Sequence, residues 1–78
     1  MTCLFDQLRC TPGTAYDVAD WIALKEIHSE MQSTSGEYDL LLKVYVPEGE
    51  DVGRYINEQI GRGKNIERTL TTLTFSAF

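Results

Sequence analysis

Long apolar runs, basic residues, cysteines and prolines are all scarce in this chain of 78 residues. No apolar stretch approaches the roughly 20 residues that span a bilayer, and the N-terminus lacks the basic cluster that begins a signal peptide. Seven Lys and Arg against twelve Asp and Glu leave a net charge of −5, which argues against binding to the phosphate backbone of nucleic acid. We therefore expect a soluble, cytoplasmic protein.

The chain has only two cysteines, Cys3 and Cys10, and one histidine, His28. An extended strand between the two cysteines would hold their sulfur atoms about 20 Å apart, too far for a disulfide. We therefore predict two free thiols. His28 has no histidine or cysteine partner at a spacing typical of metal ligands, and no other motif predicts a metal or a cofactor.

Changes in hydrophobic period divide the chain into six elements with short connections. Their predicted order is strand, helix, strand, strand, helix, strand, over residues 2–10, 14–25, 27–34, 38–46, 52–60 and 69–78. Thr14 and Asp17 form a weak capping box at the start of the first helix. Gly61 or Gly63 is expected to end the second helix in a left-handed conformation.

This order predicts an α+β fold, the ferredoxin-like βαββαβ sandwich, in which a four-stranded antiparallel sheet carries two helices on one face. We expect one domain over residues 1–78. In the strand over residues 38–46, the even-numbered and the odd-numbered side chains are both largely apolar. Such a strand needs a cover on both faces, and two helices cover only one. The other face therefore predicts a homodimer formed through the sheet, of the dimeric α/β barrel type.

Two segments of the chain resemble the effector-binding domain of the Lrp/AsnC (feast/famine) regulators. The run Ser35-Gly36-Glu37-Tyr38-Asp39, after Thr34 and before the apolar strand, matches a turn typical of that family. The run Ile66-Glu67-Arg68-Thr69-Leu70-Thr71 is similar to the start of the family's last strand. The regulators carry an N-terminal helix-turn-helix domain, whereas this chain begins at the first strand. It therefore looks like a stand-alone effector module, for which direct operator binding is not expected.

The resemblance implies that free amino acids bind near the glycine turn, at contacts between dimers. A backbone concavity at Gly36 would bind the ligand's carboxylate, Asp39 would accept from its ammonium, and Tyr38 would wall the pocket. From the residues alone, an equally good interpretation is a plain hairpin turn whose amides are satisfied by Asp39. The implied ligand-binding residues are Thr34, Ser35, Gly36, Tyr38, Asp39, Thr69 and Thr71.

Three functions follow as hypotheses. The first is a non-enzymatic module of Lrp/AsnC-type transcription regulation, in which amino-acid binding promotes assembly of dimers into a tetramer or octamer. The second is an assembly partner that joins full-length Lrp/AsnC regulators without a ligand of its own. The third is a small dimeric α/β-barrel enzyme, for which His28 is the only candidate acid or base at neutral pH.

Overall fold

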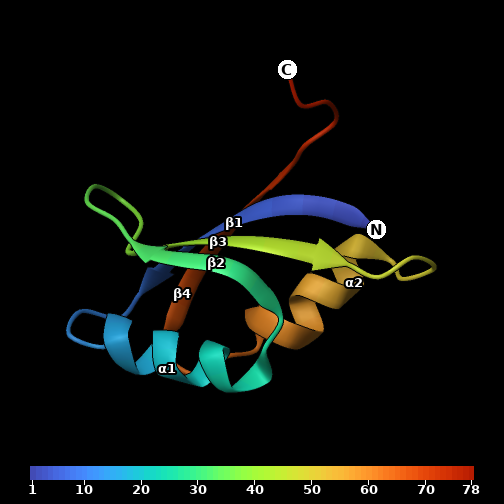
Figure 1. Cartoon of the computed structure of the whole chain (residues 1–78). Coiled ribbons are helices and arrows are strands. Elements are labelled where there is room, and N and C mark those ends of the chain that lie inside the picture. The colour runs from blue at the N-terminus through green and yellow to red at the C-terminus, as the bar shows by residue number, and fades with distance from the viewer.

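The computed structural model describes all 78 residues and has the predicted order of elements (Figure 1). The elements are β1 (Thr2–Cys10), α1 (Ala15–Lys25), β2 (His28–Ser33), β3 (Leu40–Val46), α2 (Val52–Ile56), the π-helix η1 (Asn57–Gly61) and β4 (Ile66–Leu73). The strands form one antiparallel sheet in the order β2-β3-β1-β4. The helices lie on one side of it (Figure 1), so the ferredoxin-like sandwich is confirmed.

The hydrophobic core lies between the sheet and the helices. Alternation along the two central strands, β1 and β3, directs every second side chain into it. Its buried members are all small or aliphatic: Leu4, Leu8, Cys10, Val18, Ile22, Leu40, Leu42, Val44, Val46, Ile56 and Ile60. The helices are short, and none is long and apolar enough to cross a membrane.

The opposite face of the sheet, here called the open face, carries no helix (Figure 1). Register and alternation place on it Cys3, Phe5, Gln7, Leu41, Lys43, Tyr45 and Leu70. Tyr45 and Leu70 remain 40% and 45% exposed. Large apolar side chains are thus left on a broad sheet surface, as the two-sided apolar pattern of β3 predicts.

The last strand begins and ends earlier than predicted. It covers Ile66–Leu73, and residues 74–78 form no strand. The reason lies in the register, because Leu73 is already opposite Leu4, close to the start of β1. Thr74 makes only two contacts to the carbonyl of Cys3, at 3.5 Å from its N–H and 3.0 Å from its hydroxyl. Beyond Cys3, β1 has only its first residue, Thr2, left opposite the edge strand.

The predicted capping box is not formed. Thr14 precedes α1, but its hydroxyl donates to the carbonyl of Thr11 at 2.6 Å and makes no bond to a helix amide. At α2, by contrast, Asp51 is an N-cap residue whose carboxylate accepts from the N–H of Arg54 at 2.9 Å. A carboxylate at this position is favoured by the helix dipole.

The prediction that Gly61 or Gly63 is left-handed is wrong, since neither has a positive φ. Gly63 is instead needed for packing, because a Cβ there would lie 2.6 Å from a ring atom of Trp21. The left-handed residue of this connection is Asn65, with φ of 70°. The glycine therefore admits the Trp21 ring to the seam between helix and sheet.

Candidate functional site

The connection between β2 and β3 is held at its base by three hydrogen bonds. The N–H of Thr34 donates to the carbonyl of Asp39 at 2.9 Å, and the Thr34 hydroxyl donates to the carbonyl of Tyr38 at 2.8 Å. The N–H of Asp39 donates to Leu8 of β1 at 2.8 Å. At the tip, Gly36 has φ of 98°, a conformation that side chains disfavour. The base is thus fixed while the tip is exposed.

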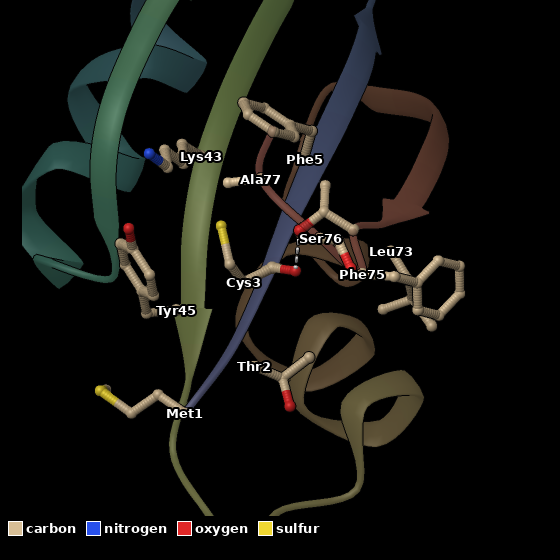
Figure 2. Close-up of a pocket in the computed structure, with 11 residues that line it drawn as sticks. Met1, Thr2, Cys3, Phe5, Lys43, Tyr45, Leu73, Phe75, Ser76 and Ala77 are labelled. Carbon is tan, nitrogen blue, oxygen red and sulfur yellow. Dashed lines mark hydrogen bonds between the residues drawn. The ribbon is translucent and has the colours of Figure 1, made fainter.

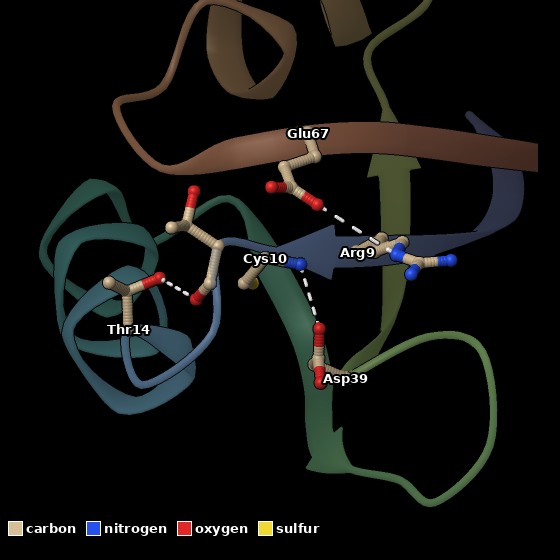
Figure 3. A network of polar contacts seen from close by, with 6 residues as sticks. Arg9, Cys10, Thr14, Asp39 and Glu67 are labelled. Carbon is tan, nitrogen blue, oxygen red and sulfur yellow. Dashed lines mark hydrogen bonds and ion pairs between the residues drawn. The ribbon is translucent and has the colours of Figure 1, made fainter.

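The side chain of Asp39 is bound to β1 rather than to its own turn. Its Oδ2 accepts from the backbone N–H of Cys10 at 2.7 Å (Figure 3). The backbone N–H groups of residues 35–38 make no backbone hydrogen bond. The hairpin interpretation, in which Asp39 satisfies the amides of the turn, is therefore wrong. These amides remain available as donors, and Asp39 Oδ1 as an acceptor.

Arg9 and Glu67 lie beside this turn because of a β-bulge. The register between β1 and β4 shifts at Arg9 and Cys10, which leaves Glu67 as an extra residue in β4. A bulge turns side chains in new directions, and here the Glu67 carboxylate lies 3.8 Å from Arg9 Nε (Figure 3). Both side chains are about half exposed. Such a half-exposed pair contributes little stability, so the Arg9 guanidinium can exchange Glu67 for another partner at little cost.

These residues border a shallow groove of about 610 Å³, here called the Arg9–Asp39 groove. It is lined by Arg9, Cys10, Pro12, Gly36, Glu37, Asp39 and Glu67. The volume is typical of small-molecule sites. The lining holds three carboxylates and one guanidinium, so negative charge is in surplus there.

Both cysteines are free thiols, as predicted. Cys3 is half-buried on the open face and Cys10 is buried in the core. Burial, and then the nearby carboxylates of Asp39 and Glu67, raise the pKa of the Cys10 thiol. A thiol with a raised pKa stays protonated at neutral pH, so Cys10 lines the groove as a packing residue.

The structure separates the predicted ligand-binding residues into two groups within one protomer. Thr34, Ser35, Gly36, Tyr38 and Asp39 all lie in the β2–β3 connection, and two of them, Gly36 and Asp39, line the groove. Thr69 and Thr71 lie on the helix-covered side of β4, opposite Leu8 and Asp6. They line a different hollow of about 260 Å³ beneath α2 and η1, which shares no lining residue with the groove.

Arg9 and Glu67 are the site residues that the sequence patterns did not reveal. Arg9 appears only as a polar residue ahead of a Pro-Gly turn, and Glu67 only as a spacer in the final motif. The predicted topology indicates that Arg9 and Glu67 lie on neighbouring strands, because the sandwich places the first strand between the third and the fourth. The bulge that turns Glu67 toward Arg9 leaves no such mark in the sequence.

Asp6 is a third residue that the sequence patterns did not single out. It is completely buried in β1, where Oδ1 accepts from the Thr71 hydroxyl at 2.9 Å and Oδ2 has no partner. Burial raises the pKa of this carboxyl from 3.8 to about 6, against the lowering effect of the Thr71 hydrogen bond. His28, the candidate acid or base, lines neither the groove nor the hollow.

A family model, a related sequence and several solved structures match this chain. Residues 3–78 match the family model of the Lrp/AsnC ligand binding domain. The chain is 34% identical over 62 residues to an uncharacterized HTH-type transcriptional regulator of Pyrococcus furiosus, PF0250. That match covers 80% of this chain and 41% of the regulator, so the chain spans about two fifths of that relative's length.

Solved structures share the fold over nearly the whole chain. FFRP-DM1 is 25% identical with a TM-score of 0.88, covering 96% of this chain and 100% of its own. TTHA0845 from Thermus thermophilus is 27% identical with a TM-score of 0.87, covering 100% and 98%. AsnC from E. coli, at 19% identity and a TM-score of 0.75, matches 97% of this chain with 52% of its own length and shows the fold alone.

Proposed function

The chain belongs to the Lrp/AsnC ligand-binding domain family, and from this premise we propose that residues 1–78 form a non-enzymatic, cytoplasmic module that senses a free amino acid. The observation that carries the proposal is the Arg9–Asp39 groove, in which one guanidinium faces three carboxylates beside a turn with free amides. The match to the family and to the HTH-type regulator PF0250 supports a role of the module in transcription regulation.

The groove is chemically complementary to an amino acid, whose carboxylate and ammonium lie only a few ångströms apart. The half-exposed Arg9 side chain offers a two-pronged donor for the carboxylate, and the free amides around Gly36 add donors. Asp39 Oδ1 accepts from the ammonium. The surplus of carboxylates repels a second ligand carboxylate, so basic and neutral polar amino acids bind and aspartate and glutamate do not.

Ligand binding is coupled to assembly in this proposal. The open face joins two copies into a homodimer, and the shallow, exposed groove is closed by a neighbouring dimer in a tetramer or octamer. A ligand held between dimers tightens assembly by the same factor by which assembly tightens its binding. The shallowness of the groove supports this arrangement, because a second surface is needed to exclude water from the ligand.

A thermal-shift panel of the twenty amino acids, each at millimolar concentration and fixed protein concentration, tests the proposal. A ligand at about 100 times its Kd adds about 2.7 kcal/mol of stability, a rise of several degrees in Tm for a domain of this size. We expect shifts from basic or neutral polar amino acids. Arg9→Gln should abolish them, whereas Arg62→Gln, at an exposed arginine beyond η1, should retain them.

Two results would count against the proposal. A panel in which no amino acid raises Tm would favour the ligand-independent assembly partner of full-length regulators. A shift that survives Arg9→Gln unchanged would place the ligand outside the groove.

A further inference from the structure

A hollow of about 260 Å³ lies between β4 and the helical segment of α2 and η1, and it is here called the hollow beneath α2. Its wall has one apolar side chain and no charged one, and its lining residues are Gly53, Ile56, Asn57, Gly61, Thr69 and Thr71. The volume is below the roughly 300–1,000 Å³ of sites for drug-sized molecules. The hollow therefore suits a ligand of very few atoms, and it shares no lining residue with the Arg9–Asp39 groove.

A buried carboxylate lies behind the wall of this hollow. Asp6 is completely buried, and its Oδ2 has no hydrogen-bond partner. Its Oδ1 accepts at 2.9 Å from the hydroxyl of Thr71, which lines the hollow. A buried carboxylate with one oxygen unpaired destabilises a protein. No salt bridge within the chain offsets this cost, because none involves Asp6.

The side chains of the hollow offer oxygen atoms that can accept or coordinate. A hydroxyl has one proton, and that of Thr71 is directed to Asp6. The lone pairs of Thr71 are thus what remains for a ligand. The side chains of Asn57 and Thr69 take part in no hydrogen bond of the chain. Three side-chain oxygens around one hollow therefore lack a donor.

The backbone of the helical segment keeps this hollow open. Gly53 and Gly61 line it without a side chain. A Cβ at Gly61 would lie only 3.0 Å from Asn57 Oδ1, so the glycine gives this oxygen its place. Residues Asn57–Gly61 form a π-helix, a rare conformation that is frequent at functional sites.

We propose that the hollow beneath α2 binds a small monovalent cation, K⁺ or an ammonium ion, whose charge is balanced by Asp6. The oxygens of Asn57, Thr69 and Thr71 hold the ion, since oxygen ligands suit K⁺ and also accept from N–H groups. The Asp6 carboxylate acts through Thr71, whose oxygen it makes a better ligand. Divalent cations favour sites with several carboxylates, whereas only one adjoins this hollow.

The hollow on the open face has the opposite chemistry (Figure 2). It measures about 740 Å³, its lining is mainly apolar, and its one charged side chain is that of Lys43. A positive side chain repels a cation. A response to K⁺ that depends on Asp6 therefore reports on the hollow beneath α2.

Thermal unfolding at constant ionic strength and about pH 8, above the pKa of about 6 of Asp6, tests the site. KCl or NH₄Cl replaces tetramethylammonium chloride, whose methyl groups keep oxygen atoms away from its charge. The Tm of the wild type should rise and then saturate, because the ion binds the folded state. Asp6→Asn should abolish this rise. Asp20→Asn, which removes an exposed carboxylate from α1, should retain it.

Amide NMR gives a second readout that a change in stability does not mimic. Titration of ¹⁵N-labelled protein with KCl should give saturable shifts at Asn57, Thr69 and Thr71. Asp6→Asn should raise the Kd for K⁺ by about tenfold or more, as the loss of a carboxylate behind a ligand does. Thr69→Val, which leaves the bond between Asp6 and Thr71 intact, should also weaken binding.

Equal Tm rises in the wild type and in Asp6→Asn would show general screening by salt and overturn the site. Shifts that do not saturate, or that spare residues 57, 69 and 71, would overturn it as well. A response to NH₄Cl alone that Asp6→Asn removes would identify the ammonium ion as the ligand.

Discussion

Asp39 joins the ends of three strands through its backbone and its side chain. Its N–H binds Leu8 of β1, its carbonyl binds Thr34 after β2, and its carboxylate binds the N–H of Cys10. The family resemblance implies Asp39 as a ligand contact, and the structure adds this supporting role. Replacing Asp39 therefore disturbs the turn as well as any ligand, which is why Arg9 is the cleaner position for testing the groove.

Asp6 should lower the stability of the protein at neutral pH. Its pKa of about 6 in the folded chain, against 3.8 as the ordinary value, means that the folded state binds more protons between these two pH values. The free energy of unfolding therefore falls as pH rises from about 4 to about 6, and the loss persists above pH 6. The shift corresponds to at most about 3 kcal/mol.

Urea unfolding of the wild-type chain and of Asp6→Asn, at pH 4 and pH 7 and equal protein concentration, measures this cost. The substitution keeps an oxygen that can accept from Thr71 and removes the buried charge. The gain in the free energy of unfolding of Asp6→Asn over the wild type should therefore be larger at pH 7 than at pH 4. An identical pH dependence in both proteins would show that Asp6 is not the titrating group.

At the scale of elements, the order and type of the helices and strands can be predicted from the sequence more accurately than the residues at which they end. The alternating and helical periods identify all four strands and both helical regions, although β2 and β4 contribute only the partly buried Met31 and Ile66 to the core. The end of β4 depends on how far β1 extends opposite it, and the bulge at Glu67 depends on pairing between distant segments. Neither is encoded within the element concerned.

Gly63 supplies a test of packing at this scale. A methyl group there would overlap two side chains, because its carbon would lie 2.6 Å from Trp21 and 2.7 Å from Ile66. Gly63→Ala should cost about 1–3 kcal/mol and lower the Tm measured by circular dichroism. Gly53→Ala is the matched control, since its methyl group meets only the Asp51 carboxylate at 3.5 Å and alanine favours helix by about 1 kcal/mol. Equal Tm changes in the two variants would contradict the role of Trp21.

For the whole molecule, the proposed ligand groove lies at the margin of the proposed dimer surface. The groove is at Arg9 and Cys10, at the end of β1, whereas the open face extends from Cys3 to Gln7 along the same strand. Alternation places Arg9 on the same side of β1 as Gln7. Two copies that pair through their open faces therefore leave each groove at the edge of the interface, within reach of a ligand and a neighbouring dimer.

The central claim is that an amino acid binds in the Arg9–Asp39 groove, and the most direct test is a titration of ¹⁵N-labelled protein with the most stabilising amino acid, followed by amide NMR shifts. We expect the largest, saturable shifts at Gly36, its neighbours in residues 35–38, and Cys10. Shifts confined to Thr69 and Thr71 would move the site to the hollow beneath α2. No amide shift at millimolar ligand would contradict the claim.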